Sequence, residues 1–143
     1  FAAGYESGGF TNAIRYITIS TLGNGAEFGD LTRTTRYPST SANAVRGVFA
    51  GGANPTRQKT IDFITIATLG DAVDFGDLST PIGDYHQGAA SPTRGVFGGG
   101  NYGSLTASIQ YVQIMTTGDS TGFGDLLAAN QYAAGFSNGH GGL

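Results

Sequence analysis

The sequence predicts an all-β protein made of three tandem, four-stranded antiparallel units of about 48 residues each. One pattern occurs three times, and its Phe-Gly-Asp-Leu segment begins at Phe28, Phe75 and Phe123, which are 47 and 48 residues apart. Glycine accounts for 25 of the 143 residues, and Thr, Ile, Val, Phe and Tyr fill the stretches between the glycines. This composition favours short pleated strands that are joined by tight turns.

The middle copy shows the elements of one unit in order. We expect a strand at residues 46–52 that ends in a glycine pair, then a polar loop, then a longer strand at residues 60–67. Apolar residues alternate onto both faces of this longer strand, so we expect both faces to be covered. Short strands follow at residues 74–78 and 85–91, and the small residues of the last one suit a crowded position near a central axis.

The unit boundaries are expected near residues 1–46, 47–94 and 95–143. The last three residues align with Arg46, Gly47 and Val48, and Phe1 aligns with Phe49. Residue 1 therefore continues residue 143 in register. Two interpretations follow: the chain is three units of a longer array, or the two ends share a strand within one ring or between subunits.

Several repeated residues resemble the kelch repeat. The strands Val48–Gly52 and Val96–Gly100 end in the glycine pair of that family, and Phe63 and Tyr111 lie where kelch strands carry an aromatic residue. Phe75 and Phe123 lie where kelch blades usually place a tryptophan. This resemblance implies β-propeller blades, in which the following phenylalanines plug the gaps between blades: Phe28, Phe75 and Phe123.

Other repeated positions are interpreted as structural. Asp30, Asp77 and Asp125 belong to the Phe-Gly-Asp-Leu segment of each copy. Arg46 and Arg94 precede the strand with the glycine pair and not the innermost strand, which departs from the kelch pattern. Their roles in kelch proteins are therefore not carried over.

The strand and turn sequences are also similar to repeats in tail-fibre and other virion proteins of marine bacteriophages. The similarity is carried by Thr93–Gly100, Ile61–Ile66 and the Phe-Gly-Asp-Leu segments, and it covers essentially all 143 residues. It implies a non-enzymatic, structural or adhesive role in a virion or an extracellular appendage. An alternative architecture is a fibre-like β-prism that three chains form together.

Three units are too few for a closed propeller, because such rings have about four to eight blades. Uncovered sheet edges and apolar faces also invite pairing. We therefore expect a homo-oligomer or an assembly with other virion or appendage proteins, with six blades from two chains as one solution.

The sequence offers no catalytic set. Its two histidines, His86 and His140, fall at different repeat positions, and neither belongs to a recognisable Ser/His/Asp or Cys/His arrangement. There is no cysteine, which excludes the copper ligands of a galactose-oxidase-type propeller. We expect no enzymatic activity and no cofactor.

Charge and hydropathy exclude two classes of partner. The net charge is −3 and the seven basic residues are scattered, so nucleic-acid binding is not expected. No apolar run reaches the roughly 18 residues of a membrane span, so membrane insertion is not expected.

Acidic or polar residues recur at a spacing of three in each copy, from Asn24, Asp71 and Asp119 onward. We interpret them as turn residues that bond their own backbone, because the spacing does not match a calcium loop. Ca²⁺ binding by these turns remains an open alternative, and no metal site is predicted.

The copies differ most in the loops after the glycine pair and before the small-residue strand. Polar and aromatic residues on such loops suit contacts with a host-surface glycan or protein, or with another subunit. A carbohydrate-binding propeller lectin is the alternative function. The candidate contact residues are Tyr5, Asn12, Asn54, Arg57, Tyr85, His86, Asn101 and Tyr102.

Overall fold

The computed structural model describes residues 1–83 and 87–138, and all regular elements in this part of the chain are β-strands. Sheet 1 contains β1 (Ala2–Glu6), β2 (Gly9–Tyr16) and β3 (Ala26–Asp30). Sheet 2 contains β4 (Ser39–Ala42), β5 (Arg46–Ala50), β6 (Thr60–Thr65) and β7 (Val73–Asp77). Sheet 3 contains β8 (Gln87–Ala90), β9 (Arg94–Gly98), β10 (Thr106–Gln113) and β11 (Thr121–Asn130).

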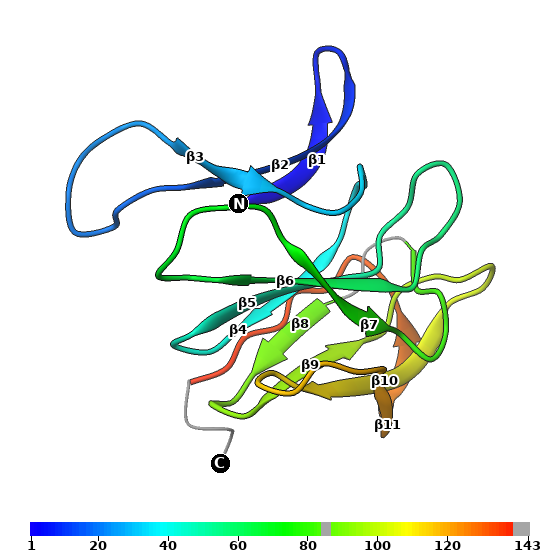
Figure 1. The fold of residues 1–143 in the computed structure, drawn as a ribbon. Helices are drawn as coiled ribbons and strands as arrows, with labels where there is room; N and C mark the ends of the chain where they lie inside the picture. Colours follow the sequence, from blue (N-terminus) through cyan, green and yellow to red (C-terminus); the bar gives the residue numbers. More distant parts are fainter. Residues whose placement is uncertain (84–86, 139–143) are drawn as a thin grey trace.

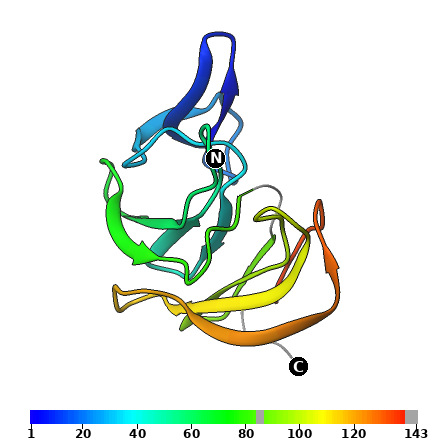
Figure 2. The ribbon, with the colours of Figure 1, turned by 90° about the vertical axis from the view of Figure 1, so that its right-hand side faces the viewer.

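Strands that follow one another in a sheet are also neighbours in space, and every pair is antiparallel (Figure 1). The predicted all-β, antiparallel class is therefore confirmed. Figure 2 shows the three sheets following one another along an open arc, from sheet 1 (blue) through sheet 2 (green) to sheet 3 (yellow and orange). The described residues do not close into a barrel or a ring.

Sheet 1 differs from the prediction, because three strands are described where four were expected. Strand β5 pairs with the small-residue strand β4, and β9 pairs with β8, but β1 has no such inner neighbour among the described residues. The C-terminal residues that align with the start of a unit, 141–143, lie outside the described part of the chain. The register between residues 143 and 1 therefore stays a prediction.

The sheets are offset from the predicted units. Ser39 of β4 pairs with Ala50 of β5, and Gln87 of β8 pairs with Gly98 of β9. The small-residue strand that ends one unit is therefore hydrogen-bonded to the first strand of the next unit. The backbone hydrogen bonds of these strand pairs join neighbouring units.

Strand β6 has both of its faces covered, as its alternating pattern predicts. Ile61 belongs to an apolar cluster between sheets 2 and 3, whereas Ile64 packs against a second cluster between sheets 1 and 2. The cluster between sheets 2 and 3 contains Val48, Ala50, Ile61, Phe75, Leu78, Ile82, Phe97, Val112 and Ile114. The cluster between sheets 1 and 2 contains Ile14, Phe28, Leu31, Phe49 and Ala72.

Candidate assembly interfaces

Two sheet-to-sheet interfaces carry the repeated residues. The first interface joins sheets 1 and 2, and the second joins sheets 2 and 3. At the first, the amide of Gly70 donates to the carbonyl of Phe28 at 2.9 Å. At the second, the amide of Gly118 donates to the carbonyl of Phe75 at 2.7 Å. The turn between the last two strands of one sheet is thus docked on the outer strand of the sheet before it.

The repeated aspartates complete this docking. Asp71 Oδ1 accepts the backbone N–H of Asp30 at 3.0 Å, and Asp119 Oδ1 accepts that of Asp77 at 2.9 Å. The carbonyl oxygens of Asp30 and Asp77 accept amides from the same turns, at 2.7 and 2.8 Å. The turn interpretation therefore needs a correction, because Asp71 and Asp119 bond the backbone of the preceding sheet. Asp74, whose Oδ1 accepts the Gly76 amide at 3.1 Å, does bond within its own strand.

A glycine allows each turn to approach so closely. Gly76 has a φ of +143°, and a Cβ placed on it would lie 2.6 Å from the carbonyl oxygen of Gly118. Gly29 occupies the equivalent place in sheet 1, where a Cβ would lie 2.3 Å from the carbonyl oxygen of Gly70. Residues with a side chain do not fit at either position, both for space and for backbone conformation.

The phenylalanines of the Phe-Gly-Asp-Leu segments meet an aromatic ring of the adjacent strand edge-on in all three sheets. The ring centroids lie 6.1 Å apart for Tyr16–Phe28, 5.9 Å for Phe63–Phe75 and 6.0 Å for Tyr111–Phe123. Phe28 and Phe75 are 8% and 3% exposed, whereas Phe123 is 54% exposed. The same local arrangement is thus buried where a following sheet exists and open on sheet 3.

Arg46 and Arg94 lie at equivalent positions, each over the aromatic ring that meets the phenylalanine in its own sheet. The guanidinium carbon of Arg46 lies 4.2 Å from the ring centroid of Phe63, and that of Arg94 lies 4.9 Å from that of Tyr111. Arg46 also donates from Nη1 to the carbonyl oxygen of Ile114 at 3.0 Å. This bond joins sheet 2 to sheet 3.

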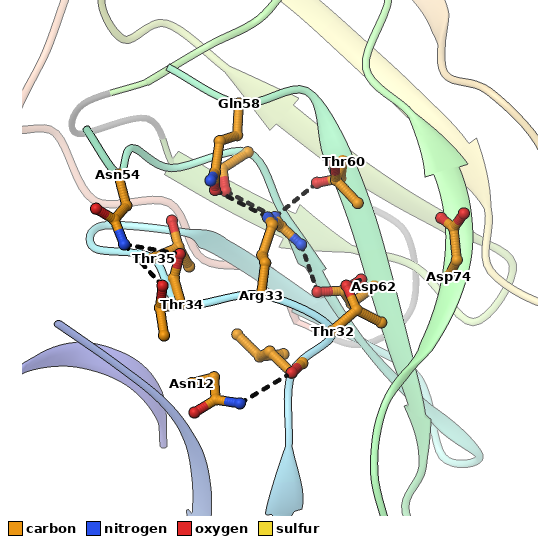
Figure 3. Close-up of polar contacts among 12 residues, drawn as sticks. Asn12, Thr32, Arg33, Thr34, Thr35, Asn54, Gln58, Thr60, Asp62 and Asp74 are labelled. Carbon is orange, nitrogen blue, oxygen red and sulfur yellow. Dashed lines mark hydrogen bonds and ion pairs between the residues drawn. The ribbon is translucent and has the colours of Figure 1, made fainter. Parts of the chain in front are cut away.

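A buried ion pair lies at the centre of the first interface (Figure 3). Arg33, from the segment after β3, pairs with Asp62 of β6, whose side chain is fully buried. Asp62 also accepts from Thr32 Oγ1 at 2.7 Å, and Arg33 donates from Nε to Gln58 at 2.9 Å. The remaining amino nitrogen of Arg33 donates to two backbone carbonyl oxygens of sheet 2, at 2.8 and 2.7 Å.

Burial dominates the electrostatics of this pair. It raises the pKa of Asp62 above its usual value, against the opposing effects of the Thr32 hydrogen bond and the Arg33 charge. It lowers the pKa of Arg33, against the attraction of Asp62. Both shifts favour the neutral forms, so the pair depends on its complete hydrogen bonding to stay charged inside the protein.

At the equivalent position of the second interface lies a cluster of uncharged polar side chains. Gln110 is 1% exposed, and its Oε1 accepts from Ser79 Oγ and Ser120 Oγ, both at 2.7 Å. Its Nε2 donates to Thr80 Oγ1 at 2.9 Å. Thr80 therefore stands where Arg33 stands in the first interface, and Gln110 stands where Asp62 stands.

Four of the predicted contact residues hold parts of the chain together, and one of them, Asn12, lies in strand β2 and not in the predicted loop. Asn12 donates to the Leu31 carbonyl at 3.3 Å, and Asn54 donates to Thr34 Oγ1 at 2.7 Å. Arg57 donates to Asn101 Oδ1 at 3.1 Å, which links the loops of sheets 2 and 3, and Asn101 donates to Gln131 at 3.2 Å.

The two predicted contact tyrosines, Tyr5 and Tyr102, remain accessible, although Tyr5 lies in strand β1 and not in the predicted loop. Tyr5 is 75% exposed and packs edge-on against Phe10, and Tyr102 is 48% exposed. Tyr85 and His86 lie outside the described residues. A ligand-binding role for any of these loop residues stays a prediction.

Sequence reasoning missed Arg33, Asp62 and Gln110. One signal was available, because Asp62 and Gln110 are polar residues at the same position of a strand that is otherwise apolar on that face. A polar side chain there needs a buried partner. Within the described residues, no group of three His, Cys, Asp or Glu side chains is placed to hold a metal ion.

Any functional conclusion rests on these interfaces, because the comparisons with protein families and curated proteins found no match. No protein-family model matches the chain, and no curated protein matches it. No helix in the described residues is long and apolar enough to cross a membrane.

Proposed function

We propose that this chain is a non-enzymatic structural protein that assembles through its sheet faces, in a phage virion or an extracellular appendage. One observation carries the proposal: apolar and aromatic residues of the internal interfaces recur at equivalent positions on the two outer faces, where no described residue covers them. Ile114 is fully buried in the second interface, whereas the equivalent Ile19 of sheet 1 is 93% exposed. Uncovered apolar faces of this kind are typical of assembly surfaces.

The architecture that we propose is a kelch-like β-propeller in which the three sheets are successive blades. The repeated glycine-pair strands, the edge-on aromatic pairs and the open arc of Figure 2 support it. Six sheets from two chains lie within the usual range of about four to eight blades. The proposed virion or appendage location rests on the similarity of the repeats to phage tail-fibre sequences.

Sedimentation of the purified chain over a wide concentration range tests the assembly function. We expect oligomers whose melting temperature rises with protein concentration, because association stabilises the folded state by mass action. A chain that stays monomeric at high concentration, with a concentration-independent melting temperature, would refute the proposal. Antibody labelling of purified particles, with host-cell envelopes as the control, tests the location.

A carbohydrate-binding lectin is the second candidate function. Two equivalent cavities favour it, one of 240 Å³ beside Phe63 and Asp71 and one of 260 Å³ beside Tyr111 and Asp119. An aromatic ring beside polar groups suits a sugar face. Binding on a glycan array that Tyr111→Ala abolishes would support this function, and an array without signal would remove it.

A further inference from the structure

We infer that the outer face of sheet 3 binds the outer face of sheet 1 in a second copy of this chain, through the contacts that join successive sheets within one chain. This inference rests on the proposed assembly function and names the two surfaces that perform it. The acceptor face is the one that receives a phenylalanine ring from the next sheet, and it consists of Arg94, Val96, Ile109, Phe123 and Leu126 of sheet 3. The donor face is the one that supplies this ring, and it consists of Phe1, Ile17, Ile19, Gly23 and Asn24, on sheet 1 and its β2–β3 turn.

Each internal interface buries one phenylalanine of the following sheet, Phe49 at the first and Phe97 at the second. Phe97 of sheet 3 lies in the cluster with Val48, Ala50, Ile61 and Leu78 of sheet 2. Phe97 pairs with Gln110 in the ladder of its own sheet. Phe97 therefore belongs to β9 by its backbone and packs against these four residues of sheet 2 by its ring.

Sheet 3 has the corresponding pocket, and it is open. A cavity of 140 Å³ is lined by Val96, Gly98, Ile109 and Leu126, which are equivalent to the four positions that receive Phe97. The equivalent ring is that of Phe1, which is 83% exposed. The Phe1 carbonyl accepts the Arg15 amide at 2.7 Å, which is the register that Phe97 has with Gln110. The cavity and the ring thus match as two halves of the same contact.

A larger groove continues from this cavity across the acceptor face. It measures 840 Å³, and its lining includes Arg94, Val96 and Phe123. The equivalent surface of sheet 2 is covered by Val112 and Ile114. Their equivalents on the donor face are Ile17 and Ile19, which are 45% and 93% exposed. Arg94 is placed to donate to the Ile19 carbonyl, as Arg46 donates to that of Ile114.

The residues that make the turn contacts of the internal interfaces also have equivalents on the two outer faces. Gly124 has a φ of +149°, as Gly76 has +143°, yet a Cβ on Gly124 would meet nothing within 4 Å. The turn glycine that fits there by equivalence is Gly23, which also has open space around it. Asn24 follows Gly23 where an aspartate follows in the other two copies. Its side-chain carbonyl can accept the Asp125 amide in the way that Asp119 accepts that of Asp77.

The small-residue strands β4 and β8 also support the contact between sheet 3 and sheet 1 of a second copy. A Cβ on Gly88 of β8 would lie 2.0 Å from the Thr40 carbonyl of β4, which shows how closely these strands approach. A Cβ on Gly135 would lie 2.7 Å from the Gly88 carbonyl, and Ser137 Oγ accepts the Ala90 amide at 3.2 Å. The segment around Gly135 therefore lies beside β8 as β8 lies beside β4. It occupies the position of an inner strand for a further sheet, and β1 has no inner neighbour among the described residues of its own copy.

One position of the contact differs from the internal interfaces. Arg15 stands where Asp62 and Gln110 stand, and Leu127 stands where Thr32 and Ser79 stand. The guanidinium of Arg15 already pairs with Glu6. The methylene stem of Arg15 is therefore the part that meets Leu127, in an apolar contact that replaces the buried polar cluster.

Two variants block one face each. Ile19→Asp places a charge on the donor face and leaves the acceptor face intact, and Phe123→Asp does the reverse. Both side chains are largely exposed in the single chain, so each variant is expected to keep its fold, which circular dichroism verifies. Tyr102→Asp makes the same charge change on an exposed loop outside both faces and is the matched control.

We expect sedimentation velocity of the full chain to show loss of assembly for Ile19→Asp and for Phe123→Asp, and no loss for Tyr102→Asp. An equimolar mixture of the two face variants should form a 1:1 complex and nothing larger, because each supplies the face that the other lacks. Wild-type-like assembly by both face variants would overturn this inference and leave the proposed function standing. A wild-type chain that does not assemble would overturn both.

Discussion

Asp119 Oδ1 accepts the backbone N–H of Asp77 at 2.9 Å across the second interface, and Asp71 makes the equivalent bond to Asp30 across the first. A carboxylate that the sequence places in a turn thus binds the sheet before it. The turn contacts of both internal interfaces use backbone groups on the outer strand of the preceding sheet.

The first prediction concerns this bond. Asp119→Ala should lower the free energy of unfolding by about 0.5–1.5 kcal/mol, toward the lower limit because the bond is exposed. Asp119→Asn keeps an oxygen acceptor at the same position and should lie close to the wild type. Urea denaturation followed by circular dichroism measures both, and equal losses for the two variants would contradict a role for the acceptor.

The second prediction separates backbone strain from close approach. Gly76→Ala and Gly124→Ala both force a side chain onto a backbone with positive φ, but only Gly76 faces a carbonyl oxygen within contact distance. Gly76→Ala should therefore be the more destabilising by about 1–3 kcal/mol, the usual cost of overpacking. Thermal melts of dilute protein test the difference, and identical losses would mean that the sheets do not approach as described.

The third prediction compares two phenylalanines with the same local partner. Phe75→Ala should destabilise the chain by about 3–5 kcal/mol, because the ring is 3% exposed in the cluster between sheets 2 and 3. Phe123→Ala should cost far less in dilute protein, because its ring is 54% exposed. Denaturant midpoints at low concentration give the comparison. A loss for Phe123→Ala as large as that for Phe75→Ala would show that Phe123 is buried within the single chain.

The fourth prediction concerns the ion pair. Arg33→Thr leaves the buried Asp62 without its counter-charge and should lower stability near pH 7 by about 3–5 kcal/mol. Arg33→Thr with Asp62→Gln copies the Thr80–Gln110 pair of the second interface and should recover much of that loss. Equilibrium unfolding of both variants tests this, and a double variant no more stable than the single one would contradict it.

The pH dependence of Arg33→Thr has a definite sign. Burial already raises the pKa of Asp62, and removal of the arginine raises it further. A carboxyl whose pKa is raised by folding contributes stability below its ordinary pKa of about 3.9, and that contribution is lost as pH rises through the folded-state value. The deficit of Arg33→Thr against the wild type should therefore grow from acidic to neutral pH. A constant deficit would assign the effect to the lost hydrogen bonds alone.

The sequence supported the fold class well, because both of its signals are local. The alternation in residues 60–67 predicted a strand covered on two faces, and Ile61 and Ile64 do pack into different clusters. The threefold pattern also placed Phe28, Phe75 and Phe123 at equivalent positions, where each meets an aromatic ring of the adjacent strand.

The hydrogen-bond and ion-pair partners of the aspartates and of Arg33 were not predictable from local sequence patterns. An aspartate beside glycine has the same sequence signature whether it bonds its own turn, as Asp74 does, or a neighbouring sheet, as Asp71 does. Arg33 and Asp62 are far apart in the sequence, and the third copy has neither residue at the equivalent positions. Their pairing follows only from how the two sheets pack.

Each internal interface joins two unlike surfaces, the outer strand of one sheet and the turn of the next. An assembly built by the same rule has a head and a tail, and every added chain advances by one constant rotation. If a whole number of such rotations makes a full circle, growth ends in a closed particle of fixed size; any other angle gives an open helical filament. The tilt between successive sheets, set by the glycine contacts at Gly29 and Gly76, therefore determines whether growth stops.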